Sequence, residues 1–328
     1  MEVRELGEKG LLERLQRFCP PDVVGDDAAV LTTQPGRLLV ITTDMLVDGV
    51  HFSDRTTSPE DVGWRAAAAN LSDLAAMGAV PVGITVALGL PGHVPVNWVE
   101  RLYQGMTECL QQYETAIVGG DICRSKAIAL AITAFGQAQP GRIIRRGAAQ
   151  RGDSIVVTGV HGASRAGLEL LLHPEVGQNL RDTERMALIQ AHQRPRPRLD
   201  VLPTLWQVVG ARAIAGMDSS DGLADAIVQL CQASGVGARI ERRQILIPDA
   251  LNSWVSPEQA LEWALYGGED FELVLCLPPE SAQVLVQQLG QGAAIVGTIT
   301  SDPAIQLIDQ TGEYPDQVLT LSRGFQHF

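Results

Sequence analysis

The side chains best suited to chemistry in this 328-residue sequence are carboxylates in short turns between apolar segments. The stretch GMDSSDGLADA, residues 216 to 226, places Asp218 and Asp221 directly after an apolar run and directly before residues with helical spacing. Ser219, Ser220 and Asp221 can all cap a helix N-terminus, so the turn offers backbone N–H groups beside two acids. Such a turn suits a metal-bound phosphate, and an ordinary capped helix is the alternative.

A strand that leads into a carboxylate also occurs near the N-terminus. The β-branched segment 37–43 predicts a strand that ends at Asp44, directly after the hydroxyl groups of Thr42 and Thr43. Carboxylate and hydroxyl oxygens are hard ligands of the kind that Mg²⁺ prefers. His51 follows shortly afterwards, and a lone histidine of this kind is either structural or functional.

Three further carboxylates stand in similar settings. Asp27 follows a glycine and Asp26 in GDDAAV, Asp73 lies on an alanine-rich helix expected from Pro59 to Gly78, and Asp121 follows two glycines after a strand. Packing several carboxylates together costs several kcal/mol each unless cations neutralise them. We therefore infer a polynuclear magnesium site whose remaining ligands are phosphate oxygens.

Composition limits the kinds of partner. The formal net charge is −13 and the only lysines are Lys9 and Lys126, which argues against a nucleic-acid partner. A phosphorylated ligand would then need cations, arginines or backbone N–H groups. The five cysteines include no CxxC pair, and neither a membrane span nor a signal peptide is recognisable, so a reduced, cytoplasmic protein without a membrane partner is expected.

The alternation of strand and helix patterns predicts an α/β protein of two domains, residues 1–138 and 139–328. The linker between them contains Arg142, Arg145 and Arg146, which either meet a polyphosphate or belong to a solvated segment. Residues 173–200 are polar and are expected to form a surface excursion. Strands are expected at 37–43, 83–90, from 116 to the two glycines before Asp121, 126–136, 153–159, from 213 to the acids of the 216–226 turn, 237–241, 271–277, 293–300 and 304–309. Helices are expected at 1–20, 59–78, 95–113, from 162, from 223, 257–265 and 279–290.

The common phosphate-binding and hydrolase motifs are missing. The sequence contains no GxxxxGK[ST] loop, no HRD segment of the kinase type and no GxSxG elbow. The pattern therefore points to an unusual phosphotransferase.

Six motifs, in their order along the chain, resemble the thiamine-monophosphate kinase family. They are GDDAAV, TTDMLVDGVHF, NLSDLAAMGA, IVGGD, DSSDGLADA and GGEDFEL. This family belongs to an ATP-binding superfamily that includes aminoimidazole ribonucleotide synthetase and selenophosphate synthetase. The resemblance implies ATP-dependent phosphorylation of thiamine monophosphate to thiamine diphosphate. It also implies a homodimer, in which the N-terminal mixed sheets form a barrel and a C-terminal α/β sandwich completes the active site.

The resemblance also assigns roles to single residues. The positions that match magnesium ligands are Asp27, Thr42, Thr43, Asp44, Asp73, Asp121, Asp218 and Asp221; those that match nucleotide contacts are Gly120, Asp121, Arg146 and Ser220; and those that match thiamine-phosphate contacts are His51, Glu269 and Phe325. The chain departs from the family pattern at Ser219, where an aliphatic residue is usual, and at Arg151, where proline is usual. Arg145 competes with Arg146 for the nucleotide position.

The mechanism follows from the chemistry of the acceptor. The second pKa of a phosphate monoester is about 6, so the attacking oxygen is already ionised and no catalytic side chain is expected. Direct in-line transfer assisted by several magnesium ions follows. The alternatives are a non-catalytic nucleotide sensor and a sibling enzyme, although the cysteine positions do not match those of the selenophosphate or hydrogenase-maturation relatives.

Overall fold

The computed structural model describes residues 1–20 and 31–320, and its chain forms two compact units. Unit 1 consists of Met1–Leu74 with Ala79–Pro140, and unit 2 consists of Ala75–Gly78 with Gly141–Phe328. Asp26, Asp27 and Phe325 lie outside the described residues. No helix within the described ranges is long and apolar enough to cross a membrane.

Unit 1 is built on a four-stranded mixed sheet in the order β1-β4-β2-β3, with β1 and β3 at its two edges. The strands are β1 (Leu38–Val47), β2 (Val80–Leu90), β3 (Ile117–Arg124) and β4 (Ala129–Ala138). Strand β4 runs antiparallel to both neighbours, whereas β2 and β3 are parallel. The mixed N-terminal sheet expected from the sequence is therefore confirmed.

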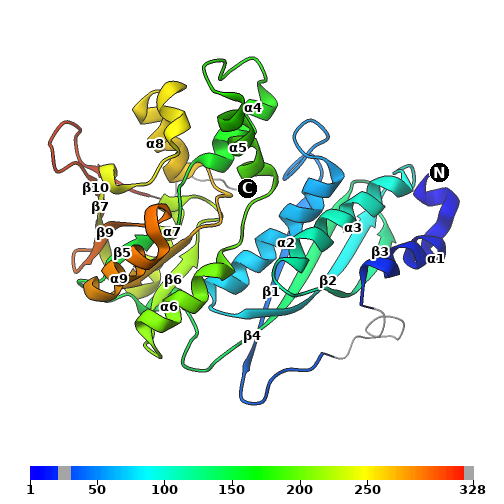
Figure 1. Cartoon of the computed structure of the whole chain (residues 1–328), viewed down its shortest axis with the longest axis horizontal. Coiled ribbons are helices and arrows are strands. Elements are labelled where there is room, and N and C mark those ends of the chain that lie inside the picture. Colours follow the sequence, from blue (N-terminus) through cyan, green and yellow to red (C-terminus); the bar gives the residue numbers. More distant parts are fainter. Residues whose placement is uncertain (21–30, 321–328) are drawn as a thin grey trace. The chain divides into compact units, whose positions relative to one another are not determined.

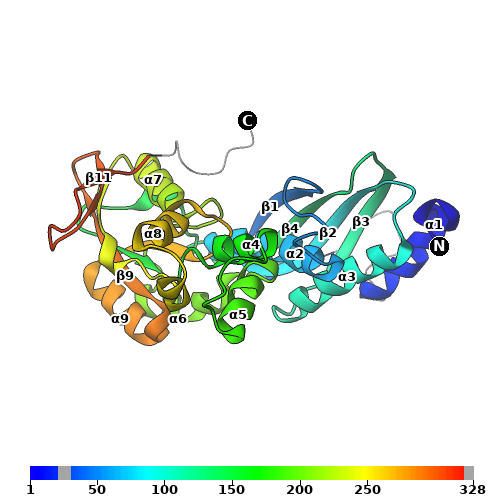
Figure 2. The same ribbon diagram turned by 90° about the horizontal axis from the view of Figure 1, so that it is seen from above.

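Two helices cover one face of this sheet, α2 (Pro59–Ala76) and α3 (Val96–Gln111) (Figures 1 and 2). Helix α2 starts where Ser58 predicts, because the Ser58 hydroxyl accepts from the N–H of Asp61 at 3.3 Å. Ala66, Ala67, Ala68 and Ala75 have no exposed surface, and such small side chains let the helix lie close to its neighbours. The N-terminal elements are α1 (Val3–Leu15) and η1 (Gln16–Phe18). They pack against α3, and the ring centroids of Phe18 and Tyr103 lie 5.9 Å apart.

The opposite face of the sheet carries no helix in the described part of unit 1 (Figure 2). Side chains alternate along β1, so Thr42 and Leu46 face the helices while the odd-numbered residues face outward. Leu39, Ile41 and Met45 are therefore 55%, 56% and 58% exposed.

Unit 2 is built on a seven-stranded sheet in the order β11-β10-β7-β9-β5-β8-β6. Its strands are β5 (Ser154–Val157), β6 (Ala215–Asp218), β7 (Gly237–Glu241), β8 (Leu273–Leu277), β9 (Ala294–Thr300), β10 (Ile305–Ile308) and β11 (Gln317–Val318). Its helices are α4 (Ala163–Leu172), α5 (Asp182–Gln193), α6 (Leu202–Val209), α7 (Leu223–Ser234), α8 (Pro257–Tyr266) and α9 (Pro279–Leu289), with short helical turns η2 (Arg146–Ala148), η3 (Arg198–Val201), η4 (Arg242–Gln244), η5 (Asp249–Ser253) and η6 (Gly290–Gly292).

The sheet of unit 2 lies between two helical layers. Ile155 and Val157 of β5 pack in one core cluster with α7 and α8, whereas Val156 packs in a second cluster with α6 and α9. Successive residues of a strand point to opposite faces, so one strand contributes to both cores. This arrangement confirms the expected α/β sandwich.

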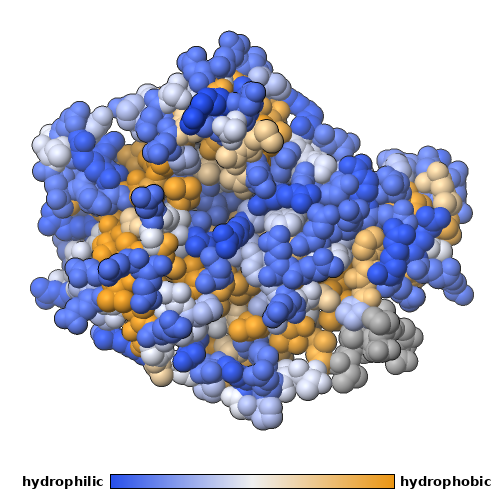
Figure 3. Space-filling view, viewed as in Figure 1, coloured by the Kyte–Doolittle hydropathy of each residue, from blue (hydrophilic) through white to orange (hydrophobic). Residues whose placement is uncertain are grey.

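The prediction of a surface excursion at residues 173–200 was wrong. Helix α5 lies in this segment and packs against α4, with Leu188 and His192 each 3% exposed. Figure 3 shows mostly hydrophilic side chains at the outer end of the helical pair. Leu188 and His192 form the buried side of α5, whereas Met186 of the same helix is 68% exposed. The polar composition of the segment concealed this amphipathic helix.

Candidate active site

Three of the predicted ligands in unit 1 lie on the helix-covered face of the sheet. Strand β1 continues to Val47, so Asp44 stands inside the strand and not at its end as predicted. Thr42 and Asp44 are two residues apart and point to the same face. The Thr42 hydroxyl donates a hydrogen bond to the Asp73 carboxylate on α2. These oxygens form one local group.

Thr43 and Asp121 lie on the open face of the same sheet. The Thr43 hydroxyl donates to the carbonyl of Ile132 at 2.9 Å. Asp121 stands inside β3, in register with Ala87 of β2, and β3 is the edge strand opposite to β1. Within one copy of unit 1, Asp121 and the group around Asp44 therefore lie on opposite faces and at opposite edges of the sheet.

Gly120 is required by the close approach of two strands. Gly120 is paired with Val86 of β2, and a Cβ atom at this position would overlap the Val86 carbonyl oxygen. Gly119, one residue earlier, leaves ordinary contact distance to Thr85, at 3.5 Å. The two glycines of the predicted nucleotide segment are thus not equivalent.

His51 lies in the turn that follows β1. Its Nδ1 atom accepts from the backbone N–H of Val47 at 3.1 Å, and its carbonyl accepts from the guanidinium of Arg65 at 3.3 Å. Arg65 is buried, with 4% of its surface exposed. These bonds fix the ring of His51 relative to the end of β1.

In unit 2, strand β6 ends at Asp218, and helix α7 begins five residues later at Leu223. The N-cap of α7 is Gly222, with a φ of 106°, so the expectation that Ser219, Ser220 or Asp221 caps the helix was wrong. Asp218 is buried, with 4% exposure, and Asp221 is partly exposed. The residues between strand and helix instead form a turn whose backbone bonds to a second turn.

That second turn comprises residues 267–272 and carries Glu269. The N–H of Ser219 donates to the carbonyl of Glu272 at 2.9 Å, and the N–H of Glu269 donates to the carbonyl of Ser220 at 2.6 Å. Glu269 has a left-handed φ of 59°. A non-glycine residue in this conformation costs about 1–3 kcal/mol and persists only when its surroundings hold it.

The serine at position 219 is accommodated by a buried histidine. Ser219 has no exposed surface, and its hydroxyl lies 3.0 Å from Nε2 of His161, which is also fully buried. Burial lowers the pKa of His161 to about 4, so the imidazole is neutral near pH 7. The polar pair fills the place where the resemblance led us to expect an aliphatic side chain.

Asp270 anchors the same turn to helix α4. Its carboxylate accepts from the N–H groups of Gly162 and Ser164 at 2.6 and 2.9 Å, which satisfies donors at the start of the helix. Burial raises the pKa of Asp270 to about 7, against the effect of these two donors.

A buried ion pair next to this turn was not predicted from the sequence. The Arg198 guanidinium donates to the Glu272 carboxylate, and both side chains are largely buried, at 13% and 15% exposure. Thr158 also donates to Glu272, at 2.6 Å. Burial raises the pKa of Glu272, while Arg198 lowers it. Glu272 stands between Phe271 and Leu273 at the start of an apolar segment, and an acid in this setting indicates that a buried cation lies nearby.

The two arginines that compete for the nucleotide position have different surroundings. Arg146 donates to the Gln229 amide of α7 at 2.6 Å. Arg145 pairs through its backbone with Ala215 of β6. Both residues are exposed, so both guanidinium groups can reach a ligand.

The oxygen donors fit a hard cation, although they are dispersed. Within residues 1–20 and 31–320, no group of three or more His, Cys, Asp and Glu residues lies close enough to hold a metal ion. The group of Thr42, Asp44 and Asp73 contains carboxylate and hydroxyl oxygens, which suit Mg²⁺ completed by phosphate oxygens.

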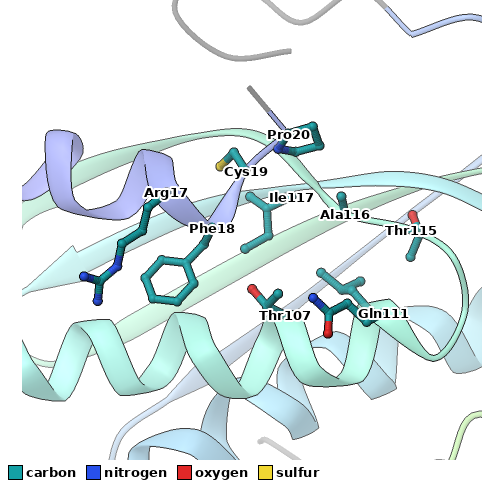
Figure 4. A pocket seen from close by; sticks show the side chains of 10 residues that line it. Arg17, Phe18, Cys19, Pro20, Thr107, Gln111, Thr115, Ala116 and Ile117 are labelled. Carbon is teal, nitrogen blue, oxygen red and sulfur yellow. The ribbon is translucent and has the colours of Figure 1, made fainter. Parts of the chain in front are cut away.

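A pocket elsewhere in unit 1 contains none of the predicted site residues. It has a volume of about 300 Å³. Figure 4 shows Phe18 and Cys19 on one side of it and Thr107 and Gln111 of α3 on the other. The described residues expected to carry the chemistry lie on strands, on turns and, for Asp73, on helix α2, and none of them lines this pocket.

Comparison with known proteins defines the class. The N-terminal domain model of AIR synthase related proteins matches residues 25–138, and the C-terminal domain model matches residues 150–310. The hydrogenase maturation protein HypE of E. coli shares the fold, with a TM-score of 0.77 at 19% identity, covering 95% of this chain and 97% of that one. The two units thus define an AIR synthase related protein.

Two closer matches identify the family within this class. Thiamine-monophosphate kinase of Synechococcus elongatus is 52% identical over 330 residues, which cover 99% of this chain and 97% of the relative. The structure of AaThiL complexed with AMPPCP and TMP has a TM-score of 0.77 at 33% identity and covers 100% of this chain and 99% of its own. The chain belongs to the thiamine-monophosphate kinase family.

Proposed function

We propose that the protein phosphorylates thiamine monophosphate to thiamine diphosphate, with ATP as the phosphoryl donor. The observation that carries this proposal is the match of the whole chain to AaThiL complexed with AMPPCP and TMP. AMPPCP is an ATP analogue, so that protein binds a nucleotide and a second phosphorylated ligand. The six motifs that carry the family resemblance lie in both units of this chain.

The residues of this chain hold two anions and need not move a proton. The acceptor phosphate has a second pKa of about 6, so its attacking oxygen is ionised near neutral pH. Gly120, Asp121, Arg146 and Ser220 are proposed to contact the nucleotide, and His51, Glu269 and Phe325 are proposed to contact thiamine monophosphate. Their proposed task is to align the two substrates and exclude water, and an acceptor that is already ionised needs no general base.

Magnesium is proposed as the counter-charge. The proposed ligands are Asp27, Thr42, Thr43, Asp44, Asp73, Asp121, Asp218 and Asp221. When bound, the ions would neutralise the carboxylates and the phosphate oxygens during transfer. The bonded pair of Thr42 and Asp73, beside Asp44, supports this assignment.

We also propose that the protein is a cytoplasmic homodimer. The exposed residues Leu39, Ile41 and Met45 on the uncovered face of the unit 1 sheet support self-association, because an apolar sheet face is normally buried. Free cysteines in the described part of the chain suit a reducing compartment.

An assay with purified protein, ATP, magnesium and thiamine monophosphate tests the proposal. We expect ADP and thiamine diphosphate in equal amounts, and loss of both in Asp44→Asn, with Asp54→Asn in an exposed loop as the matched control. Binding of ATP without release of ADP would instead identify a nucleotide sensor.

A further inference from the structure

His192 occupies a buried position that neither the sequence motifs nor the proposed mechanism uses. It lies near the end of α5 and is 3% exposed. Helix α5 approaches α4 closely at Gly167, where a Cβ atom would overlap the Leu188 carbonyl oxygen and come within 3.0 Å of the His192 Cβ. Helices α4 and α5 are thus packed so closely that the His192 imidazole reaches the N-terminal end of α4.

The imidazole meets the turn of Glu269 at this point. Its Nδ1 atom lies 3.6 Å from the Glu269 carboxylate and 3.1 Å from the Ser164 hydroxyl. Ser164 also donates its N–H to Asp270 at 2.9 Å. Asp270 is therefore bonded directly to the start of α4, whereas the neighbouring Glu269 is connected to it by way of His192.

Glu269 is held in this way while part of it stays open to a ligand. Its backbone N–H is bonded to Ser220, its φ is left-handed, and its side chain is 36% exposed. A glutamate side chain loses rotamer freedom when a ligand fixes it, and this loss of entropy weakens binding. A residue that orients the carboxylate beforehand removes part of this cost from binding.

We propose that His192 is a positioning residue that orients the Glu269 carboxylate toward the cationic aromatic ring of the phosphorylated acceptor. The proposal rests on the proposed function, because it assumes that Glu269 contacts the acceptor. His192 acts through Glu269 and does not touch the substrate. Its effect falls on binding of the acceptor and not on phosphoryl transfer.

Steady-state kinetics of His192→Leu and His192→Asn test this role. Leucine removes the Nδ1 atom that lies beside Glu269 and Ser164, whereas asparagine can place an amide N–H near the same point. We expect His192→Leu to raise the KM for thiamine monophosphate about tenfold, with kcat and the KM for ATP within about twofold of wild type. The KM of His192→Asn for thiamine monophosphate should lie much closer to that of the wild type.

His173→Leu is the matched control. His173 also lies beside carboxylates, 3.4 Å from Glu175, but it is 52% exposed and remote from the turn, so its replacement should leave all constants unchanged. An unchanged acceptor KM in His192→Leu would overturn the proposal. A fall in kcat with no rescue by asparagine would also overturn it, because that pattern indicates a structural role.

Thermal stabilisation by thiamine monophosphate without ATP separates this inference from the proposed function. If the wild type binds the acceptor but does not convert it, the proposed kinase activity fails. A smaller thermal shift in His192→Leu than in His192→Asn would then still support the positioning role. Equal shifts in the two variants, or no shift in the wild type, would overturn it.

Discussion

The backbone N–H of Glu269 donates to the carbonyl oxygen of Ser220 at 2.6 Å. This bond joins the turn proposed to contact thiamine monophosphate to the turn that carries Asp218 and Asp221. Because both turns belong to unit 2, the positions of these side chains are coupled through one short stretch of backbone. A change in either turn should therefore affect both substrates.

Gly268→Ala tests this coupling. Gly268 has a φ of 68°, and a Cβ atom there would lie 2.8 Å from the Ser220 carbonyl oxygen, so alanine should push the two turns apart. We expect the KM for both substrates to rise about tenfold. Gly290→Ala is the matched control, since Gly290 has a φ of 78° with no atom within 4 Å and should cost only about 1–2 kcal/mol of stability. Equal kinetic effects in the two variants would contradict the coupling.

Gly120→Ala tests the proposed nucleotide segment of β3. The new Cβ would overlap the Val86 carbonyl oxygen and separate β3 from β2, which should weaken ATP binding about tenfold or more. Gly119→Ala should bind ATP normally, because its nearest contact is at 3.5 Å. Titration of both variants with an ATP analogue makes the comparison, and similar affinities would argue against the role of Gly120.

Stability should depend on pH through Asp270. Burial raises the pKa of Asp270 from 3.8 to about 7, so between these values the folded state keeps a proton that the unfolded state has lost. The free energy of unfolding should therefore fall as the pH rises through this window. Urea unfolding of wild type and Asp270→Asn checks this expectation. If the free energy of unfolding changes with pH by the same amount in both proteins, the pH dependence belongs to other groups.

The Arg198–Glu272 pair should matter for stability more than an exposed ion pair. Arg198→Leu leaves the buried Glu272 carboxylate without its cation, which should destabilise the protein by about 3–5 kcal/mol. Arg196→Leu is the control, because the pair of Arg196 with Asp200 is exposed and should contribute less than about 1 kcal/mol. Chemical denaturation measures both, and similar losses would contradict this view of the Glu272 network.

The secondary structure was largely predictable because hydrophobic spacing is local information. The strands around Asp44 and Asp121 and the helix around Asp73 were confirmed, although both strands continue past their acids. Polar composition concealed helix α5, since half of an amphipathic helix is hydrophilic. The carboxylates were recognisable from the residues that surround them in sequence.

The contacts between distant segments were not predictable in the same way. Nothing in the sequence indicates that Arg198 reaches Glu272 or that His192 reaches Glu269, because each pair depends on how helices and strands pack. The separation of Asp44 and Asp121 at opposite edges of one sheet depends on strand order, which a single sequence does not specify.

We propose that the phosphoryl group passes directly from ATP to the ionised phosphate of thiamine monophosphate, with no phosphorylated protein intermediate. The stereochemistry of transfer from ATP with a chiral γ-phosphorus tests it most directly. We predict inversion of configuration at phosphorus, as one in-line displacement requires. Retention would indicate two successive displacements through a phosphoenzyme and would contradict the account.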